Sequence, residues 1–168
     1  MTIQGKIYKD IWDTFTSLEI GERDIETRTL TRKSRNPQTG QWEESPYDLH
    51  YYKWSSAWRE AMNHFPSATY EFETFDRGGK LYDVMYYANE TASVHCTVTI
   101  EGVSRDMWLP VMDYSNKAIP NPSARDISDA KMRCLVKTLA MFGLGMDLYE
   151  GKYSEGAGDE AQNTETAN

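Results

Sequence analysis

The sequence predicts an α+β fold in which helices pack on an antiparallel β-meander. Residues 126–142 have the apolar spacing of a long amphipathic helix. Residues 92–101 alternate apolar and polar side chains, as a half-buried strand does, and Glu101-Gly102 supplies a turn into a second strand over 103–111. A strand pair followed by a long helix therefore forms the centre of the predicted domain.

The chain of 168 residues has the length of one compact domain, which we place at residues 1–150. Residues 151–168 are acidic and almost free of apolar side chains after Tyr153, so we expect a disordered tail. The net charge of −8 argues against a surface coated with positive charge for nucleic acid. Any DNA site must then be a local patch.

The residue pattern in the N-terminal third of the sequence predicts a helix followed by a projecting β-hairpin. Ile11, Trp12, Phe15 and Leu18 fall on one side of a helix over residues 8–19. Residues 22–47 contain a threonine-rich stretch and a turn cluster at 36–40, which together indicate a hairpin with a polar surface.

A shorter helix and two strands are predicted before the central strand pair. Trp54, Trp58 and Met62 recur every four residues, which predicts a helix with Ser55 or Ser56 as its N-cap. Residues 68–75 alternate as a strand, Gly78-Gly79 forms a turn, and 81–88 are predicted to return alongside.

The C-terminal helix has two unlike sides. Its apolar side contains Leu135, Leu139 and Phe142, and Gly143 and Gly145 follow it as stop signals. Arg133 and Lys137, four residues apart, form a narrow basic ridge on the opposite side. A loop over 113–125 precedes the helix.

Motifs for nucleotide, metal or covalent chemistry are missing from the sequence. It has no GxxxxGK[ST] phosphate loop, so the sequence shows no ATP site that could drive strand exchange or helicase activity. Cys96 and Cys134 lack the spacing of a zinc site, and we expect both to be small buried hydrophobes. We therefore predict neither a cofactor nor a metal.

Two groups of basic residues are candidates for DNA binding, since single strands are bound by cations on phosphates and aromatic rings on bases. The first group lies on and around the last helix and near the second helix: Lys131, Arg133, Lys137, Lys117 and Lys53, the last beside Tyr51 and Tyr52. The second group lies on the hairpin: Arg28, Arg32, Lys33 and Arg35. Two other interpretations stay open: a solvated helix face, and a hairpin that is merely exposed or docks on a neighbouring subunit's acidic surface.

Motifs along residues 52–151 resemble those of a known family. They run in order as Tyr52-x-Trp54-x-x-x-Trp58, Phe65-Pro66-x-Ala68-Thr69-Tyr70, Thr97-Val98-Thr99-Ile100-Glu101-Gly102, Met107-Trp108-Leu109-Pro110-Val111-Met112-Asp113, Asn116-Lys117-Ala118-Ile119, Met132-Arg133-Cys134-Leu135-Val136-Lys137 and Ala140-Met141-Phe142-Gly143-Leu144-Gly145. In this stretch the chain resembles the phage single-strand annealing proteins of the Sak type, in the Rad-fifty-two-like superfamily.

The resemblance implies a non-catalytic recombinase subunit that forms rings or helical filaments with DNA in a basic groove. Lys137 stands where such proteins place a groove-lining cation, whereas Ala140 replaces another. Lys53, Lys117 or Arg105 is therefore expected to contribute. The hairpin over 22–47 is longer than the family pattern leads us to expect, so we treat it as an insertion.

The resulting hypothesis is annealing of complementary single strands by an ATP-independent oligomer in phage recombination. The resemblance alone implies a phage exonuclease and a host single-strand binding protein as partners. Because the sequence has no signal peptide or membrane span, we expect the cytoplasm of an infected bacterium. The alternative is a metal-dependent nuclease or resolvase that uses Asp113, Asp126 and Asp129, with Asp106 nearby in sequence.

Overall fold

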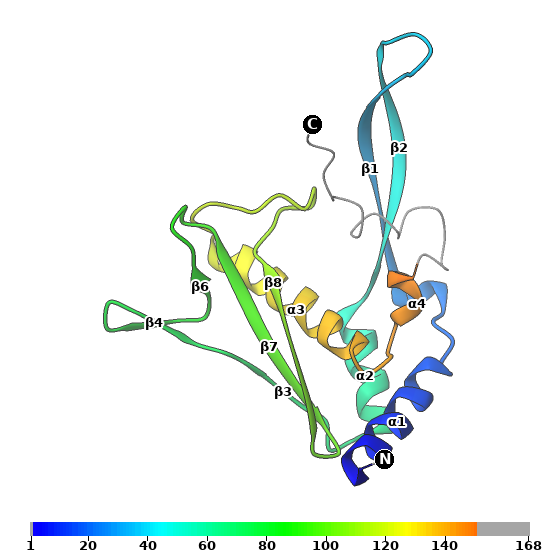
Figure 1. Cartoon of the computed structure of the whole chain (residues 1–168), viewed down its shortest axis with the longest axis vertical. Helices are drawn as coiled ribbons and strands as arrows, with labels where there is room; N and C mark the ends of the chain where they lie inside the picture. The colour runs from blue at the N-terminus through cyan, green and yellow to red at the C-terminus, as the bar shows by residue number, and fades with distance from the viewer. Residues whose placement is uncertain (1, 151–168) are drawn as a thin grey trace.

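A computed structural model describes residues 2–150 and confirms an α+β fold with antiparallel strands, a long C-terminal helix, an N-terminal helix and a projecting hairpin (Figure 1). The predicted tail, 151–168, lies outside the described residues. The elements in order are α1 (Ile3–Thr16), the short 3₁₀ helix η1 (Glu22–Asp24), β1 (Ile25–Arg35), β2 (Trp42–Tyr52), α2 (Trp54–His64), β3 (Thr69–Phe72), β4 (Phe75–Arg77), β5 (Lys80–Tyr82), β6 (Met85–Tyr86), β7 (Ala92–Ile100), β8 (Val103–Pro110), α3 (Ala124–Ala140) and α4 (Met146–Tyr149).

The main sheet is built around β7, which pairs with β8 on one edge and with β3 and β6 on the other. Between β7 and β8, Glu101 and Gly102 both have positive φ, as a tight two-residue hairpin turn requires. Val94, Cys96, Val98 and Ile100 are buried on one face of β7, which confirms the alternation expected of this strand.

Helix α3 covers that buried face (Figure 1). The Cys134 Sγ lies 3.8 Å from the carbonyl oxygen of Val94 on β7 and 3.3 Å from that of Met107 on β8. Burial raises the pKa of the Cys96 thiol to about 11 and of the Cys134 thiol to about 12. Both cysteines are buried hydrophobes, as expected, and their thiols stay protonated at neutral pH.

Local signals fix both ends of α3. The Ser123 hydroxyl and the Asp126 carboxylate form a reciprocal capping box at its start. Gly143 and Gly145 follow the helix with φ of 101° and 73°, a conformation that other residues adopt with strain. The helix thus begins two residues before the predicted range and ends near the predicted stop.

The first two helices start where the sequence did not place them. Helix α1 begins at Ile3 because the Thr2 side chain caps it by accepting a hydrogen bond from the Gly5 amide. The N-cap of α2 is Lys53, so the expectation of Ser55 or Ser56 was wrong. Ser56 is instead buried and donates its hydroxyl proton to the Asp24 carboxylate, 2.8 Å away.

The predicted segments 68–75 and 81–88 pair with each other only beside the turn, where Phe75 lies opposite Tyr82. Strand β3 pairs with the C-terminal half of β7, and β6 with its N-terminal end. Gly78-Gly79 forms the predicted turn as the tip of a short hairpin, β4–β5, whose three residue pairs project from the side of the sheet (Figure 1).

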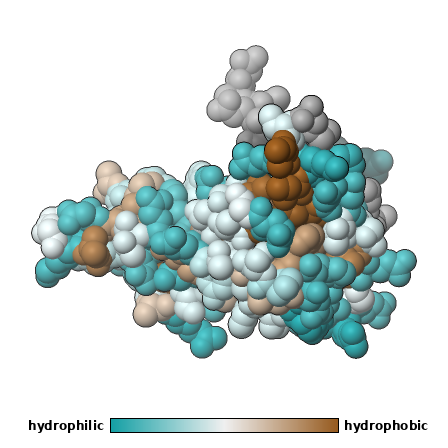
Figure 2. Space-filling view, turned by 90° about the horizontal axis from the view of Figure 1, so that it is seen from below, coloured by the Kyte–Doolittle hydropathy of each residue, from teal (hydrophilic) through white to brown (hydrophobic). Residues whose placement is uncertain are grey.

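The hairpin β1–β2 extends away from the body along the long axis (Figure 1). All eleven residues of β1 pair with β2, and β2 continues past the predicted hairpin to Tyr52. Seen from the end opposite the hairpin tip, most of the surface is hydrophilic and one hydrophobic strip stands out (Figure 2). Among residues 2–150, none of the helices is long and apolar enough to cross a membrane.

Candidate nucleic-acid interface

One face of the β1–β2 hairpin alternates arginine with tyrosine. Residues opposite each other in an antiparallel pair lie on the same face, and every second residue of a strand shares it. The register therefore puts Arg28 and Arg32 of β1 on one face with Tyr47 and Tyr51 of β2. The Arg32 guanidinium lies 5.7 Å from the Tyr47 ring centre, and that of Arg28 lies 5.8 Å from the Tyr51 ring centre. We call these four residues the Arg–Tyr face.

The long helix extends the Arg–Tyr face at the base of the hairpin. The Arg133 guanidinium on α3 lies 5.5 Å from the Tyr51 ring centre, so two arginines from distant parts of the chain contact one ring. Arg133 also donates a hydrogen bond to the Asn116 Oδ1 at 3.1 Å, which ties the loop after β8 to the same place. Lys117 is the exposed neighbour of Asn116, and Lys137 follows Arg133 by about one helical turn.

Carboxylates moderate the positive charge of this region. Arg28 Nε donates to Glu26 Oε1 at 2.8 Å, and this hydrogen bond raises the Arg28 pKa further above its ordinary value. Arg28 is thus a permanent cation, and a phosphate must compete with Glu26 for it. Arg133 has an amide oxygen and an aromatic ring as its neighbours, which leaves its positive charge uncompensated by those contacts.

Three other predicted site residues hold elements of the fold together. Lys131 forms an ion pair of 2.7 Å with Asp83 and covers the Phe72 ring, away from Arg133. Arg105 lies 4.0 Å from the ring centre of Tyr8 on α1. Lys53 donates to the Arg23 carbonyl oxygen at 2.6 Å and so fixes the connection between η1 and the hairpin base.

The remaining predicted hairpin residues lie on the face opposite Arg32. Lys33 forms an ion pair of 3.0 Å with Glu44, and Arg35 Nε donates to the Gly40 carbonyl oxygen at 2.9 Å. Tyr52 is buried at the hairpin base, and burial raises the pKa of its hydroxyl. Tyr47 was missed by sequence reasoning, because the centre of the predicted turn at 36–40 would set it opposite Thr29; only the observed register sets it opposite Leu30, on the face of Arg28 and Arg32.

The carboxylates of the nuclease alternative have local structural partners. Asp113 Oδ1 accepts hydrogen bonds from the Ser115 and Lys117 amides, and Asp126 caps α3; these bonds lower the pKa of both carboxyls. Asp129 forms an i,i+4 ion pair with Arg125 at 4.0 Å. In the described part of the chain, no three His, Cys, Asp or Glu residues gather as a metal site would require.

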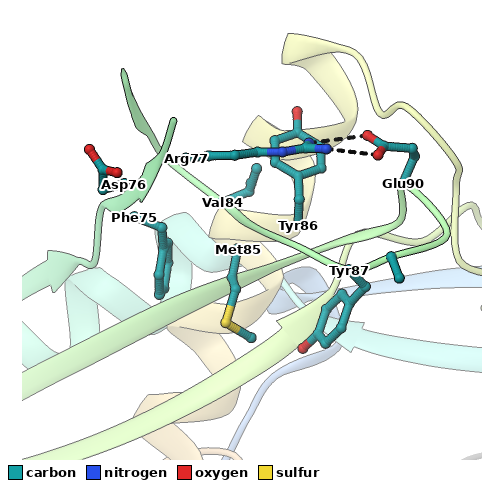
Figure 3. A pocket seen from close by; sticks show the side chains of 9 residues that line it. Phe75, Asp76, Arg77, Val84, Met85, Tyr86, Tyr87 and Glu90 are labelled. Atoms are coloured by element: carbon teal, nitrogen blue, oxygen red, sulfur yellow. Dashed lines mark hydrogen bonds and ion pairs between the residues drawn. The ribbon is translucent and has the colours of Figure 1, made fainter. Parts of the chain in front are cut away.

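A separate hollow of about 450 Å³ lies beside the β4–β5 hairpin and is lined by Phe75, Met85 and Tyr87 among others (Figure 3). The Arg77 guanidinium lies over the Tyr86 ring, 4.7 Å from its centre, and forms an ion pair of 2.7 Å with Glu90 (Figure 3). These contacts satisfy the arginine within the chain.

Comparison with known proteins gives the family of this chain. The model of the Sak Single Strand Annealing Protein family matches residues 28–166, so the match includes most of the hairpin and the whole sheet and long helix. Among curated proteins, the search found no relative of this chain. Family membership supports a role in annealing single-stranded DNA in recombination. The match spans most of the sequence, and the chain therefore belongs to the Sak family of single-strand annealing proteins.

Proposed function

We propose that this protein binds single-stranded DNA along the Arg–Tyr face and Arg133, and anneals complementary strands as an ATP-independent oligomer. The observation that carries the proposal is the Tyr51 ring with Arg28 and Arg133 both within 6 Å of its centre. Cations that track phosphates, combined with aromatic rings that stack on bases, are the chemistry of single-strand binding without sequence preference.

The spacing of the arginines suits an extended strand. Arg28 and Arg32 are separated by four residues on β1, which is about 13 Å at the rise of a β-strand. The two tyrosines occupy the same face of β2, so cations and rings follow one line along the hairpin. Lys117 and Lys137 would extend this line at its base, where Arg133 contacts Asn116.

Base pairing itself can drive annealing. Each stacked step of a new duplex contributes about 1.4 kcal/mol, so the protein has only to hold strands with their bases accessible. One subunit offers few phosphate contacts, and repetition of weak sites in an assembly raises avidity by about 10²–10⁴. We include in the proposal a phage exonuclease that supplies single strands and a host single-strand binding protein that is displaced.

The two faces of the hairpin allow a matched test. Arg32 and Lys33 are adjacent, carry the same charge and point to opposite faces. We expect Arg32→Ala to weaken binding of an oligonucleotide and to flatten the dependence of log affinity on log salt by about 0.7, the value of one phosphate contact. Lys33→Ala, which leaves the Arg–Tyr face intact, should keep the wild-type slope.

Annealing of two labelled complementary strands, measured with EDTA and without nucleotide, completes the experiment. Arg32→Ala should slow annealing at limiting protein, whereas Lys33→Ala should not. Equal effects of the two substitutions would show that the hairpin acts only through its total charge, and no effect of either would remove the Arg–Tyr face from the site.

A further inference from the structure

The face of the main sheet that α3 does not cover carries a distinctive surface. The register aligns Glu71 and Asp106 on either side of Thr97, and it aligns Trp108 with His95. These side chains alternate with the buried residues of β7, so they share the outer face. Trp108 is 51% exposed although it lies in the middle part of a strand.

Aromatic and acidic groups are concentrated on this face. The His95 ring stacks on Trp108 with centres 6.3 Å apart, and Phe75 meets His95 at 5.0 Å. Glu73 lies with its carboxylate 3.9 Å from His95 Nδ1. We call this surface the acidic sheet patch, and it consists of Glu71, Glu73, Phe75, His95, Asp106 and Trp108. Along β3, β7 and β8, the outward positions that the structure describes contain no lysine or arginine.

The tip of the β1–β2 hairpin has the complementary chemistry. Trp42 is 71% exposed and pairs across the strands with Arg35, so a large apolar ring and a cation share one face. This is the face opposite the Arg–Tyr face, because Arg35 and Arg32 differ by an odd number of positions. The hairpin tip therefore has a surface that DNA bound to the Arg–Tyr face leaves accessible.

We infer that the hairpin tip of one copy, through Trp42 and Arg35, docks on the acidic sheet patch of a second copy. An exposed tryptophan gains most by burial against other aromatic rings, and a neighbouring cation is favoured beside carboxylates. The contact joins two unlike surfaces, and such a contact produces closed rings or open helical filaments. The inference rests on the self-association contained in the proposed function and assigns its surfaces.

The same observations favour protein over DNA as the occupant of the patch. Trp108 could stack on a base, but Glu71, Glu73 and Asp106 would lie close to the phosphates of a bound strand. Binding of DNA releases counterions only where cations neutralise phosphates, and the outward strand positions supply none. A basic and aromatic segment meets no such repulsion.

Charge reversal on each surface, followed by their combination, tests the contact. Arg35→Glu places a negative tip against a negative patch, and Glu71→Arg with Asp106→Arg places a positive patch against a positive tip. We expect each variant to sediment as a monomer at micromolar concentration without DNA. The triple variant restores complementary charges and should reassemble. Arg125→Glu, a reversal at a side chain that is 88% exposed on α3, is the matched control and should assemble as the wild type does.

Tryptophan truncation provides an independent measurement. Trp42→Ala should weaken association roughly 30-fold, the effect of losing a central tryptophan from an interface. Trp54→Ala removes another exposed tryptophan, 48% accessible at the start of α2, and should leave association unchanged. Circular dichroism of every variant checks that the fold survives.

The outcomes separate this inference from the proposed function. Binding of an oligonucleotide short enough for one subunit should stay at the wild-type level in Trp42→Ala, which changes no charge and lies on the face opposite the Arg–Tyr face. Assembly that persists after Arg35→Glu and Trp42→Ala would overturn the inference while leaving DNA binding standing. A triple variant that folds but stays monomeric would also overturn the inference. A Trp108→Ala variant that assembles normally but loses DNA affinity would reassign the patch to DNA.

Discussion

Replacement of Gly145 by alanine should destabilise the protein through a contact at the base of the hairpin. Gly145 has φ of +73°, and a Cβ atom there would lie 2.8 Å from Cδ1 of Tyr52. Tyr52 is the last residue of β2 and is only 7% exposed, so neither ring nor backbone has open space into which to move. The substitution therefore combines an unfavourable backbone conformation with a steric clash.

The magnitude follows from these two effects. A left-handed conformation costs a non-glycine residue about 1–2 kcal/mol, and overpacking of a buried site costs about 1–3 kcal/mol more. We expect a loss of about 2–5 kcal/mol from a total stability that for such domains is about 5–15 kcal/mol. Gly102 is the matched control, because its φ is +76° and a Cβ there would meet nothing within 4 Å.

Urea unfolding followed by tryptophan fluorescence measures both variants. Gly102→Ala should show only the backbone cost, about 1–2 kcal/mol, and Gly145→Ala clearly more. Equal losses in the two variants would refute the reasoning, since they would mean that Tyr52 does not pack against Gly145 as described. Because Tyr51 precedes Tyr52, the Gly145 variant should also bind single strands less tightly than the Gly102 variant does.

Three further predictions concern the candidate site and the ends of elements. Replacing both Arg133 and Lys137 by alanine should reduce the slope of log single-strand affinity against log salt by about 1.4, the value of two phosphate contacts. A double variant whose assembly dissociates into monomers would instead assign these residues to a subunit interface. Hydrogen bonds from the Ser56 hydroxyl and Arg59 lower the pKa of the Asp24 carboxyl in the folded protein. Asp24 therefore stabilises the fold above the pKa of its unfolded state and loses this effect as pH falls through the lower folded pKa. Asp24→Asn should lower the urea midpoint at pH 7, and the difference from the wild type should close below about pH 4. Ser123→Ala removes half of the capping box and should cost about 1 kcal/mol by urea titration, whereas Ser128→Ala, an exposed change within the same helix, should cost little.

Local patterns in the sequence determined the central part of this protein. The alternation over Val94, Cys96 and Val98 fixed which face of β7 is buried, and Glu101-Gly102 fixed the turn into β8. The apolar spacing of Leu135, Leu139 and Phe142 predicted the long helix and its buried side. These features depend on residues a few positions apart, so period and turn chemistry are sufficient to predict them.

Only the tertiary structure decided which cations belong to one surface. Lys131 and Arg133 are two residues apart, yet Lys131 pairs with Asp83 whereas Arg133 contacts Tyr51. Arg105, expected to be available for DNA, instead covers the Tyr8 ring.

The pairing of strands was also beyond local pattern. The segments at 68–75 and 81–88 look like partners in sequence, but beyond the turn at Gly78-Gly79 they separate, and residues 69–72 and 85–86 pair with β7. Likewise the hairpin register, which local pattern does not determine, decides that Tyr47 shares a face with Arg32 and not with Lys33. The physical reason is the same in all these cases. Periodicity along the sequence determines which side of a helix or strand is apolar. The partner of a polar side chain depends on contacts between residues far apart in the chain, and these contacts form only when the elements pack.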